Sequence, residues 1–252
     1  MLIAQSITKT FGGNHAVNEV SFVIERGTIT GLIGPNGAGK TTLFNCVAGL
    51  FPPTSGSLSL GEERIDGLSP DRIFAKGLAR TFQIPRPFPE MTVLENVMVA
   101  PLRQRGEQFW ANWLTPGRVA AEERRLAAAA RHWIDFVGLS HLTHQPARVL
   151  SGGQRKLLEL ARVLVAEPRL ILLDEPGAGV NPILLDAIVD RIVTLNRQGV
   201  TFLIIEHNMD LVMSLCSPIM VMAQGRILMT GTAQEVRHDP RVIDAYLGGA
   251  VA

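Results

Sequence analysis

A glycine-rich stretch, GLIGPNGAGKTTLFN at residues 31–45, constrains the fold of this chain more than any other part of its sequence. Residues 34–41 match the pattern G-x-x-x-x-G-K-[ST] in full, and Thr28–Ile33 before them are typical of a short buried strand. The residues from Lys40 to about Gly49 favour a helix. Glycines at these spacings let successive backbone N–H groups point into one concavity that binds phosphate. The stretch therefore predicts a strand, a phosphate-binding loop and a helix in succession.

The predicted loop assigns roles toward a nucleotide to its residues. The dipole of the following helix adds positive potential, Lys40 reaches the β and γ phosphates, and the Thr41 hydroxyl is a ligand for Mg²⁺. The alternative is a glycine-rich turn that only resembles the pattern, and the strand and helix on either side argue against it. The predicted phosphate-binding residues are Gly34, Pro35, Asn36, Gly37, Ala38, Gly39, Lys40, Thr41 and Thr42.

The rest of the chain indicates an α/β body interrupted by a mainly helical insert. Short β-rich runs separated by glycine turns fill residues 1–30 and predict antiparallel strands. After Pro168, buried strands at 170–173 and 201–205 alternate with helices at 184–195 and 209–216. We expect one domain of 252 residues, with residues 1–83 and 166–252 forming the nucleotide-binding body and residues 84–165 the helical insert.

Smaller local signals complete this outline. Apolar spacing predicts helices at Ala120–Val137 and from Ser151 to about Ala166. The segment IMVMAQGRILMTG predicts a hairpin that turns at Gln224–Gly225. The sequence Thr232-Ala233-Gln234-Glu235 is a capping box that opens a C-terminal helix.

Two acidic residues follow the predicted strand Leu170–Leu173. Asp174 lies at its carboxyl end, where α/β sheets bind ligands, and its carboxylate can hold Mg²⁺ through water. Glu175 is placed to orient or deprotonate an attacking water. An apolar strand that ends in Asp-Glu is weak evidence by itself, but together with the phosphate loop it predicts nucleotide hydrolysis.

The stretch LSGGQ at residues 150–154 forms a second predicted anion site. Ser151 and Gln154 make a capping box at a helix start, and Gly152 and Gly153 leave the first-turn N–H groups open to an outside ligand. The chain already has a phosphate loop, so a second such site suits a nucleotide held mainly by another subunit. An ordinary capped helix remains the alternative by local physics.

Taken together, GPNGAGKT, LSGGQ and LILLDEP in this order resemble the ATP-binding subunit of ABC transporters, and the resemblance covers nearly the whole chain. It implies a P-loop NTPase (RecA-like) core with an N-terminal antiparallel β subdomain and a helical insert subdomain. It also implies that Gln83, in RTFQ, is a catalytic and Mg²⁺-binding residue at the hinge of the insert. It implies that His207, in IIEHN, contacts the γ-phosphate and that Phe11 stacks on adenine, with simple packing as the alternative for Phe11.

The resemblance implies ATP and Mg²⁺ as cofactors and a homodimer, or a heterodimer with a related ATPase subunit. Each ATP then lies between one phosphate loop and the Ser151, Gly152, Gly153 and Gln154 helix start of the partner. Many members have Ser-Ala-Leu-Asp after the catalytic glutamate, whereas this chain has Gly179-Val180-Asn181-Pro182. Asn181 can bond across the dimer interface but carries no charge.

The resemblance further implies two transmembrane permease subunits and, indirectly, a solute-binding protein as partners. The run Ile84–Glu90, IPRPFPE, is predicted to line the groove that receives a permease helix, with a rigid surface loop as the alternative. Trp110 and Trp113 join that contact or pack in the insert. The first residues lack a signal-peptide pattern, and no stretch approaches the ~18–20 apolar residues that cross a bilayer. We expect a peripheral protein on the cytoplasmic face of the inner membrane.

A finer resemblance is to the longer ATPase of branched-chain amino acid importers. It rests on FGGNHAVNEVSF, RTFQIPRPFPEMTVLENVMVA, the insert around WLTPGRVAAEERR, GAGVNP and VIDAYLG. ATPases for urea or short amides share much of this pattern, and the lipopolysaccharide-export ATPase shares the AYLG-type ending. These remain alternatives for the transported solute.

Composition weighs against two other classes of ATPase. With 24 basic and 23 acidic residues the net charge is +1, so we expect no nucleic acid as a partner. A soluble nucleic-acid-associated ATPase of this superfamily also needs a long coiled-coil insertion. A ribosome-associated ATPase needs two ATP-binding modules in one chain. The two cysteines, Cys46 and Cys216, are predicted to be buried thiols rather than a disulfide.

Overall fold

The computed structural model describes residues 1–81, 85–102, 104, 110, 113 and 115–247. The chain forms two compact units. The first contains Met1–Arg80, Arg169–Gly177 and Ile192–Ala252, and the second contains Thr81–Pro168 and Ala178–Arg191. Gln83, predicted to lie at the hinge of the insert, is outside the described residues.

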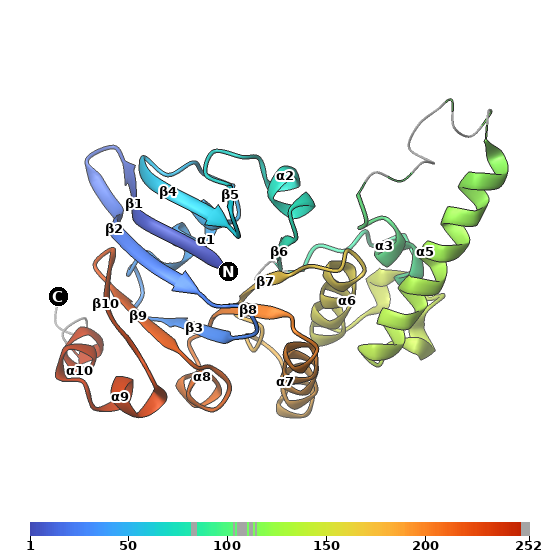
Figure 1. Cartoon of the computed structure of the whole chain (residues 1–252). Helices are drawn as coiled ribbons and strands as arrows, with labels where there is room; N and C mark the ends of the chain where they lie inside the picture. Colours follow the sequence, from blue (N-terminus) through green and yellow to red (C-terminus); the bar gives the residue numbers. More distant parts are fainter. Residues whose placement is uncertain (82–84, 103, 105–109, 111–112, 114, 248–252) are drawn as a thin grey trace. The chain divides into compact units, whose positions relative to one another are not determined.

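A six-stranded sheet forms the centre of the first unit (Figure 1). Its order is β10-β9-β3-β8-β7-β6, in which the strands from β9 to β6 are parallel and β10 pairs antiparallel with β9. The strands are β3 (Ile29–Ile33), β6 (Leu78–Arg80), β7 (Leu170–Asp174), β8 (Thr201–Ile205), β9 (Ile219–Ala223) and β10 (Arg226–Gly231). Strands β3, β7, β8 and β9 are buried at every position, as expected of a parallel sheet covered on both faces.

The second sheet of this unit is antiparallel and has the order β2-β1-β4-β5. Its strands are β1 (Leu2–Phe11), β2 (Asn14–Ile24), β4 (Ser55–Leu60) and β5 (Glu63–Arg64). The turn from β1 to β2 passes through Gly12, whose φ is 58°. The prediction of antiparallel strands joined by glycine turns is therefore confirmed, and so is the hairpin of β9 and β10 at Gln224–Gly225.

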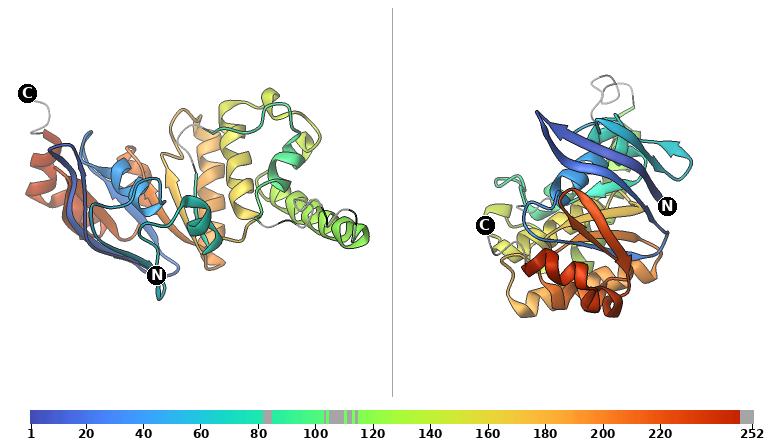
Figure 2. Two further views of the ribbon diagram at one scale, coloured as in Figure 1. Left: turned by 90° about the horizontal axis from the view of Figure 1, so that it is seen from above. Right: turned by 90° about the vertical axis from the view of Figure 1, so that its left-hand side faces the viewer.

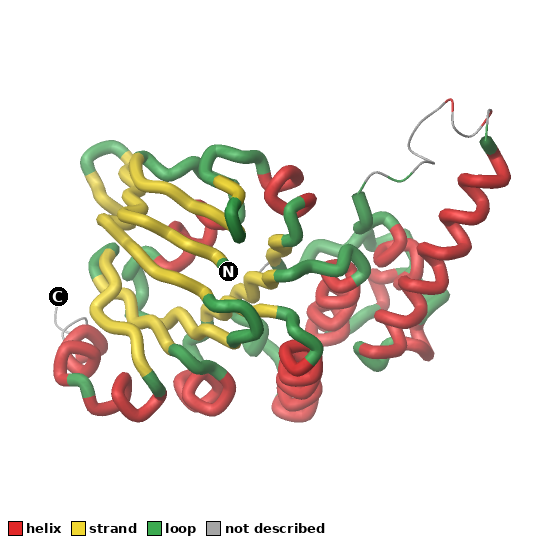
Figure 3. The backbone as a smooth tube through the Cα atoms, viewed as in Figure 1, coloured by secondary structure: helices red, strands yellow, loops and turns green. Residues whose placement is uncertain are grey.

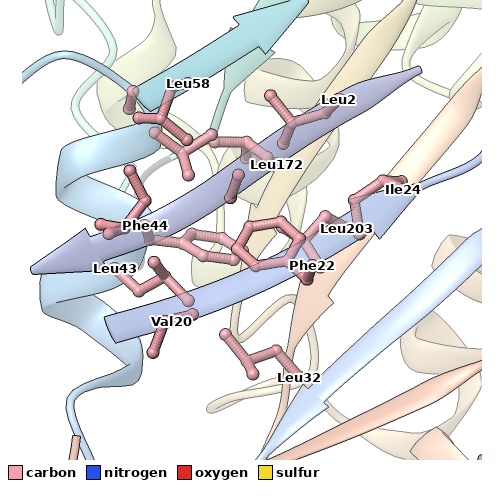
Figure 4. Close-up of a cluster of buried hydrophobic side chains, with 14 of the residues drawn as sticks. Leu2, Val20, Phe22, Ile24, Leu32, Leu43, Phe44, Leu58, Leu172 and Leu203 are labelled. Carbon is pink, nitrogen blue, oxygen red and sulfur yellow. The ribbon is translucent and has the colours of Figure 1, made fainter. Parts of the chain in front are cut away.

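Helix α1 (Lys40–Val47) contributes side chains to the core that joins the two sheets. Figure 4 shows Leu43 and Phe44 of α1 among side chains from both sheets, such as Leu58, Leu172 and Leu203. Phe44 is fully buried, and a Phe→Ala change at such a site costs about 3–5 kcal/mol. This packing fixes α1, and α1 in turn fixes the glycine-rich loop at its start.

The remaining helices of the first unit are short. Helix α9 packs against β10 and β9, and α10 follows beside α9 (Figures 1 and 2). The helices are α2 (Pro70–Ala75), α8 (Met209–Leu215), α9 (Ala233–His238) and α10 (Pro240–Leu247), while α7 (Pro182–Arg197) runs through both units. The predicted capping box at the start of α9 is confirmed, with Thr232 and Glu235 bonded reciprocally.

The described part of the second unit consists of helices and loops (Figure 3). Its helices are α3 (Val93–Met98), α5 (Pro116–Phe136) and α6 (Gly152–Leu164), with 3₁₀ turns η2 (Ser140–Leu142) and η3 (Ala147–Val149). The three helices pack on one another through buried apolar residues, as the sequence spacing of α5 and α6 predicts. These residues include Val93, Val97, Ala130, Ile134, Leu157, Leu158 and Ala161.

Helix α3 lies in a region where the sequence shows no clear period. Its start carries a full capping box, in which Thr92 and Glu95 bond each other's backbone N–H. Asn96 is fully buried, accepts a hydrogen bond from Phe88 N at 2.8 Å and donates to the Phe88 carbonyl at 3.0 Å. One asparagine therefore folds the proline-rich segment before α3 back onto the helix.

Candidate functional site

The glycine-rich loop connects β3 to α1, as predicted, and two of its glycines are sterically required. Gly34 has φ 150°, and a Cβ there would lie 1.9 Å from the Met222 carbonyl oxygen. Gly39 has φ 98°, and its Cβ would lie 2.2 Å from the Ala16 carbonyl oxygen. Strands β9 and β2 thus press on the loop at both ends and hold its backbone in a shape that other residues cannot adopt.

The start of α1 is suited to an anion. Its N-cap residue, Gly39, makes no side-chain hydrogen bond to the helix, so no side chain caps its first turn. Thr41 is exposed and Thr42 is half-buried, and both belong to this first turn. An uncapped helix start with small hydroxyl residues fits a nucleotide phosphate and the Mg²⁺ that accompanies it.

Lys40 folds back over the loop. Its Nζ donates to the carbonyl oxygens of Gly34 at 2.7 Å and Pro35 at 2.9 Å, and the residue is only 6% exposed. Burial lowers the pKa of Lys40, and the carboxylate of Glu175 acts in the opposite direction. The loop therefore holds an ammonium group that a phosphate can attract away from two neutral carbonyls.

Asp174 ends β7 and is 6% exposed. Its Oδ2 accepts a hydrogen bond from Nη2 of Arg80 at 2.8 Å. Arg80, at the end of β6, also donates through Nη1 to Oδ1 of Asn45 in α1. The sequence interpretation identified Asp174 but missed Arg80, since nothing in the local sequence of β6 indicates which residue it pairs with.

Glu175 and His207 are side by side. Glu175 follows β7 with φ 50°, and its backbone N–H donates to the Ile205 carbonyl at 2.9 Å. His207 follows β8, and its Nε2 is 3.0 Å from Oε1 of Glu175. Because β7 and β8 are parallel neighbours, the residues after both strands emerge at the same sheet edge.

Glu206 fixes the loops that carry this pair, and sequence reasoning missed it. It is 4% exposed. Its Oε1 accepts from Gly177 N at 2.6 Å, and its Oε2 accepts from His207 N at 2.9 Å and Asn208 N at 3.3 Å. The available signal was an acidic residue directly after a fully buried, mainly apolar strand, a position where a buried charge needs several donors.

Two further aromatic residues of the first unit are Phe11 and Tyr246. Phe11, at the end of β1, is 47% exposed and meets Phe51 edge-on at 5.6 Å, with Lys9 Nζ 5.1 Å from its ring centre. Part of Phe11 therefore packs within the protein while the rest stays accessible. Tyr246 of α10 makes a hydrogen bond with the Gly34 backbone, which opposes the rise in its pKa that burial causes.

The Ser151–Gln154 segment lies in the second unit and forms the predicted capping box of α6. Ser151 N donates to Oε1 of Gln154 at 2.9 Å, and Gln154 N donates to Oγ of Ser151 at 3.3 Å. Gly152 has open space at its Cβ position, whereas a Cβ on Gly153 would lie 2.0 Å from Leu184. One glycine thus faces open space and the other permits close packing.

Asn181 belongs to the same unit and acts locally on α7. Its Oδ1 accepts a hydrogen bond from Leu184 N at 2.9 Å.

The candidate site residues belong to both units. Lys40, Asp174, Glu175 and His207 lie in the first unit, and Ser151–Gln154 and Asn181 lie in the second.

The ABC transporter family model matches residues 17–178, which include the glycine-rich loop, Ser151–Gln154 and Glu175. This chain belongs to the ABC transporter family. A second model, described as a branched-chain amino acid ATP-binding cassette transporter, matches residues 226–252 of this ABC protein. Homologues with this ATP-binding domain are ATPases coupled to transport.

Relatives of this ABC protein align from end to end. The high-affinity branched-chain amino acid transport ATP-binding protein BraF of Pseudomonas aeruginosa is 42% identical over 99% of this chain and 98% of its own length. The corresponding LivG protein of Escherichia coli K12 is 40% identical over 99% of this chain and 98% of its own length. A probable LivG of Archaeoglobus fulgidus is 40% identical over 98% of this chain and 95% of its own length.

Solved structures of ABC cassettes have the same fold. A nucleotide-free ATP-binding cassette from an ABC transporter matches with a TM-score of 0.85 and 35% identity, covering 97% of this chain and 98% of the other. The ADP conformation of an ATP-binding cassette matches with a TM-score of 0.83 and 35% identity, covering 98% of both chains. The predicted fold class is therefore confirmed.

Among the described residues, no helix has the length and apolar character needed to cross a membrane.

Proposed function

We propose that this protein hydrolyses Mg²⁺·ATP to power the import of branched-chain amino acids through a membrane transporter. The observation that carries the ATPase part is the pairing of Glu175 with His207 at the edge that also presents Lys40 and Asp174. The observation that carries the solute part is the end-to-end similarity to branched-chain amino acid transport proteins, together with the match at residues 226–252.

The nucleotide is held by the glycine-rich loop and by Lys40. Backbone N–H groups at the start of α1 donate hydrogen bonds to phosphate oxygens, and the ammonium of Lys40 exchanges its two carbonyl partners for the β and γ phosphates. Phe11 offers its exposed face to the adenine. The Thr41 hydroxyl and Asp174, the latter through water, hold Mg²⁺, which neutralises phosphate charge.

Glu175 orients the attacking water and accepts its proton, and His207 donates toward the γ-phosphate. Glu175 and His207 are adjacent, so the water that Glu175 orients lies beside the histidine that reaches the γ-phosphate. Glu206 holds the loops after β7 and β8 in place by accepting hydrogen bonds from three backbone N–H groups. Gln83, which lies outside the described residues, is proposed as a further Mg²⁺ ligand.

We assign Ser151, Gly152, Gly153 and Gln154 to the nucleotide of a second subunit, either a copy of this chain or a related ATPase. The exposed Ser151 and the open space above Gly152 support this assignment, because the helix start is accessible to an outside phosphate. Asn181 caps α7, which packs against Gly153 through Leu184, so the dimer-facing loop and this helix start are mechanically linked.

The permease subunits dock on the second unit, which places the protein on the cytoplasmic face of the membrane. The proline-rich segment supports this assignment because Asn96 fixes it firmly while Phe88 stays 50% exposed. An exposed aromatic ring on a fixed segment suits an apolar side chain of a partner helix. A solute-binding protein completes the system without touching this chain.

Uptake of labelled leucine tests the solute assignment. Cells lacking this gene are compared after rescue with the wild type, with Glu175→Gln, or with Glu62→Gln, an exposed site that receives the same chemical change. We expect the wild type and Glu62→Gln to restore uptake and Glu175→Gln to fail.

Unchanged leucine uptake on deletion, in cells without a redundant system, would refute import of branched-chain amino acids. Uptake of urea and short amides, and export of lipopolysaccharide, would then be measured. ATPase activity that responds to nucleic acid or ribosomes, and not to permease subunits, would refute a transport role altogether.

A further inference from the structure

Arg80 makes an unusual set of contacts for a residue at the end of an edge strand. Its side chain is 11% exposed, and Nη2 donates to Oδ2 of Asp174 at 2.8 Å. Nη1 donates to Oδ1 of Asn45, and the guanidinium carbon lies 5.9 Å from the centre of the Phe44 ring. The planar guanidinium is thus held at two hydrogen-bonding edges and against one aromatic ring.

These contacts join three elements that meet at the proposed site. Arg80 extends from β6, Asp174 ends β7, and Asn45 and Phe44 lie on α1, whose first residue is Lys40. Phe44 is fully buried in the core between the two sheets, so the ring against the guanidinium is itself held by close packing. Arg80 therefore connects the carboxylate proposed for Mg²⁺ to the helix that begins at the phosphate loop.

We propose that Arg80 is a positioning residue that fixes the Asp174 carboxylate for Mg²⁺, a role that rests on the proposed nucleotide site. The guanidinium occupies Oδ2 and sets the plane of the carboxylate, which leaves Oδ1 for the water that coordinates the metal. Groups that orient a metal-binding residue in this way change metal affinity or activity by about 10–100-fold when they are replaced. Lysine cannot substitute, because a point charge lacks the two donating edges that reach Asp174 and Asn45.

A second effect has the opposite sign. The Arg80 charge repels a divalent cation, so removing it strengthens Mg²⁺ binding if orientation is unimportant. The two effects separate by substitution. Arg80→Lys keeps the charge and loses the planar fork, whereas Arg80→Met loses both. Positioning predicts weaker Mg²⁺ binding in both variants, and repulsion alone predicts stronger binding in Arg80→Met and no change in Arg80→Lys.

The experiment is calorimetric titration of the purified full-length protein with ADP, in excess Mg²⁺ and again in EDTA. We expect Mg²⁺ to tighten ADP binding in the wild type. In Arg80→Lys this enhancement should fall about 10-fold or more, while ADP affinity in EDTA stays within about twofold, because the loop and Lys40 are intact. Arg191→Met is the matched control, since Arg191 also stacks on a ring, at 5.4 Å from Phe136, but belongs to the second unit.

An unchanged Mg²⁺ enhancement in a folded Arg80→Lys would overturn the proposal, as would a gain in Arg80→Met. Arg80→Lys decides the question if Arg80→Met fails to fold, because it leaves Asp174 with a positive neighbour. A wild type that does not bind ADP in either condition would instead refute the proposed nucleotide site. This measurement does not use leucine uptake, so a failure of the solute assignment would leave the proposal about Arg80 intact.

Discussion

Nε2 of His207 lies 3.0 Å from Oε1 of Glu175, which joins the residues that follow two neighbouring parallel strands. Glu175 adopts φ 50°, a conformation that non-glycine residues rarely take, and the hydrogen bond of its N–H to Ile205 O sustains it. The backbone conformation at Glu175 thus lowers the stability of the folded state while it directs this carboxylate toward the histidine. This pair should act as one unit in hydrolysis.

A double-mutant cycle tests that unit. Glu175→Gln should lower the rate of ATP hydrolysis by about 10²–10⁴-fold, the range for a positioned general base, and His207→Ala should also lower it. The double variant should be little slower than Glu175→Gln alone, because residues that act together show non-additive losses. Phosphate release gives the rates, and a fluorescent ATP analogue confirms that binding persists. Fully multiplicative losses would contradict a shared role.

Lys40→Met should weaken ATP binding about 10–150-fold. The estimate corresponds to the net loss of one hydrogen bond to a charged phosphate, which is worth about 1.5–3 kcal/mol. The free energy of unfolding should not fall, because burial already disfavours the ammonium, as the lowered pKa of Lys40 indicates. Equilibrium titration with ATP and denaturant unfolding measure the two quantities. Normal ATP affinity in this variant would contradict the assignment of Lys40 to the phosphates.

Ser151→Ala and Thr232→Ala remove equivalent capping boxes at α6 and α9. Each should lower the free energy of unfolding by about 1 kcal/mol. Only Ser151→Ala should abolish cooperative ATP hydrolysis and ATP-dependent dimerisation, because only this helix start is assigned to the partner's nucleotide. Size-exclusion chromatography of both variants, each carrying Glu175→Gln and loaded with ATP, makes the comparison. Equal dimerisation of the two would show that Ser151 is only a cap.

Glu206→Gln should loosen the loops after β7 and β8. The amide replaces one accepting oxygen with a donor that faces a backbone N–H, so we expect a loss of about 1–3 kcal/mol in unfolding free energy. ATP hydrolysis should drop because His207 is displaced, while ADP affinity stays the same. Glu235→Gln is the control, since it makes the same change in an exposed capping box. A wild-type rate of ATP hydrolysis in Glu206→Gln would contradict the role of Glu206 in holding the two loops.

The two buried thiols should make stability fall at alkaline pH. Burial raises the pKa of Cys46 to about 11 and that of Cys216 to about 12, from 9.0. Below pH about 9 both states bind the thiol protons, and this contribution to stability is fully present. As pH rises from about 9 toward 12 the unfolded thiols ionise first, so each thiol lowers the unfolding free energy by at most about 1.4 kcal/mol per pH unit.

Urea unfolding at pH 8 and pH 10 measures this effect. Cys216→Ala should show a smaller loss between the two pH values than the wild type. The native thiols should also resist alkylation at pH 8, since Cys46 and Cys216 are 2% and 4% exposed. Rapid labelling of the native protein would contradict their burial.

Much of the fold follows from local patterns. The glycine-rich loop, the apolar strands Leu170–Leu173 and Thr201–Ile205, and the hairpin at Gln224–Gly225 were predicted because each is encoded within a few neighbouring residues. The capping boxes of α6 and α9 belong to the same group. Helix α3 was overlooked although Thr92 and Glu95 carry the capping pattern, because prolines on its N-terminal side hide the apolar period.

The residues of the candidate site form two groups: some are indicated by local sequence patterns, and others depend on partners that are distant in the sequence. Lys40, Asp174, Glu175 and His207 could be proposed from the sequence because each follows a strand or loop with a recognisable pattern. Arg80 and Glu206 could not, because their partners are far along the chain. The partner of Arg80 is 94 residues away, and that of one Glu206 oxygen is 29 residues away.

The sequence by itself determined most of the strands and helices, although not α3, and it indicated the residues that we propose for phosphate binding and hydrolysis. Backbone conformation at a turn or cap depends on neighbouring residues, so a local pattern is sufficient. Only the tertiary structure decided that Arg80 holds Asp174, that Glu206 ties two loops together, and that Glu175 meets His207. These contacts depend on strand order and on the packing of α1 between two sheets, which long-range burial of apolar side chains fixes.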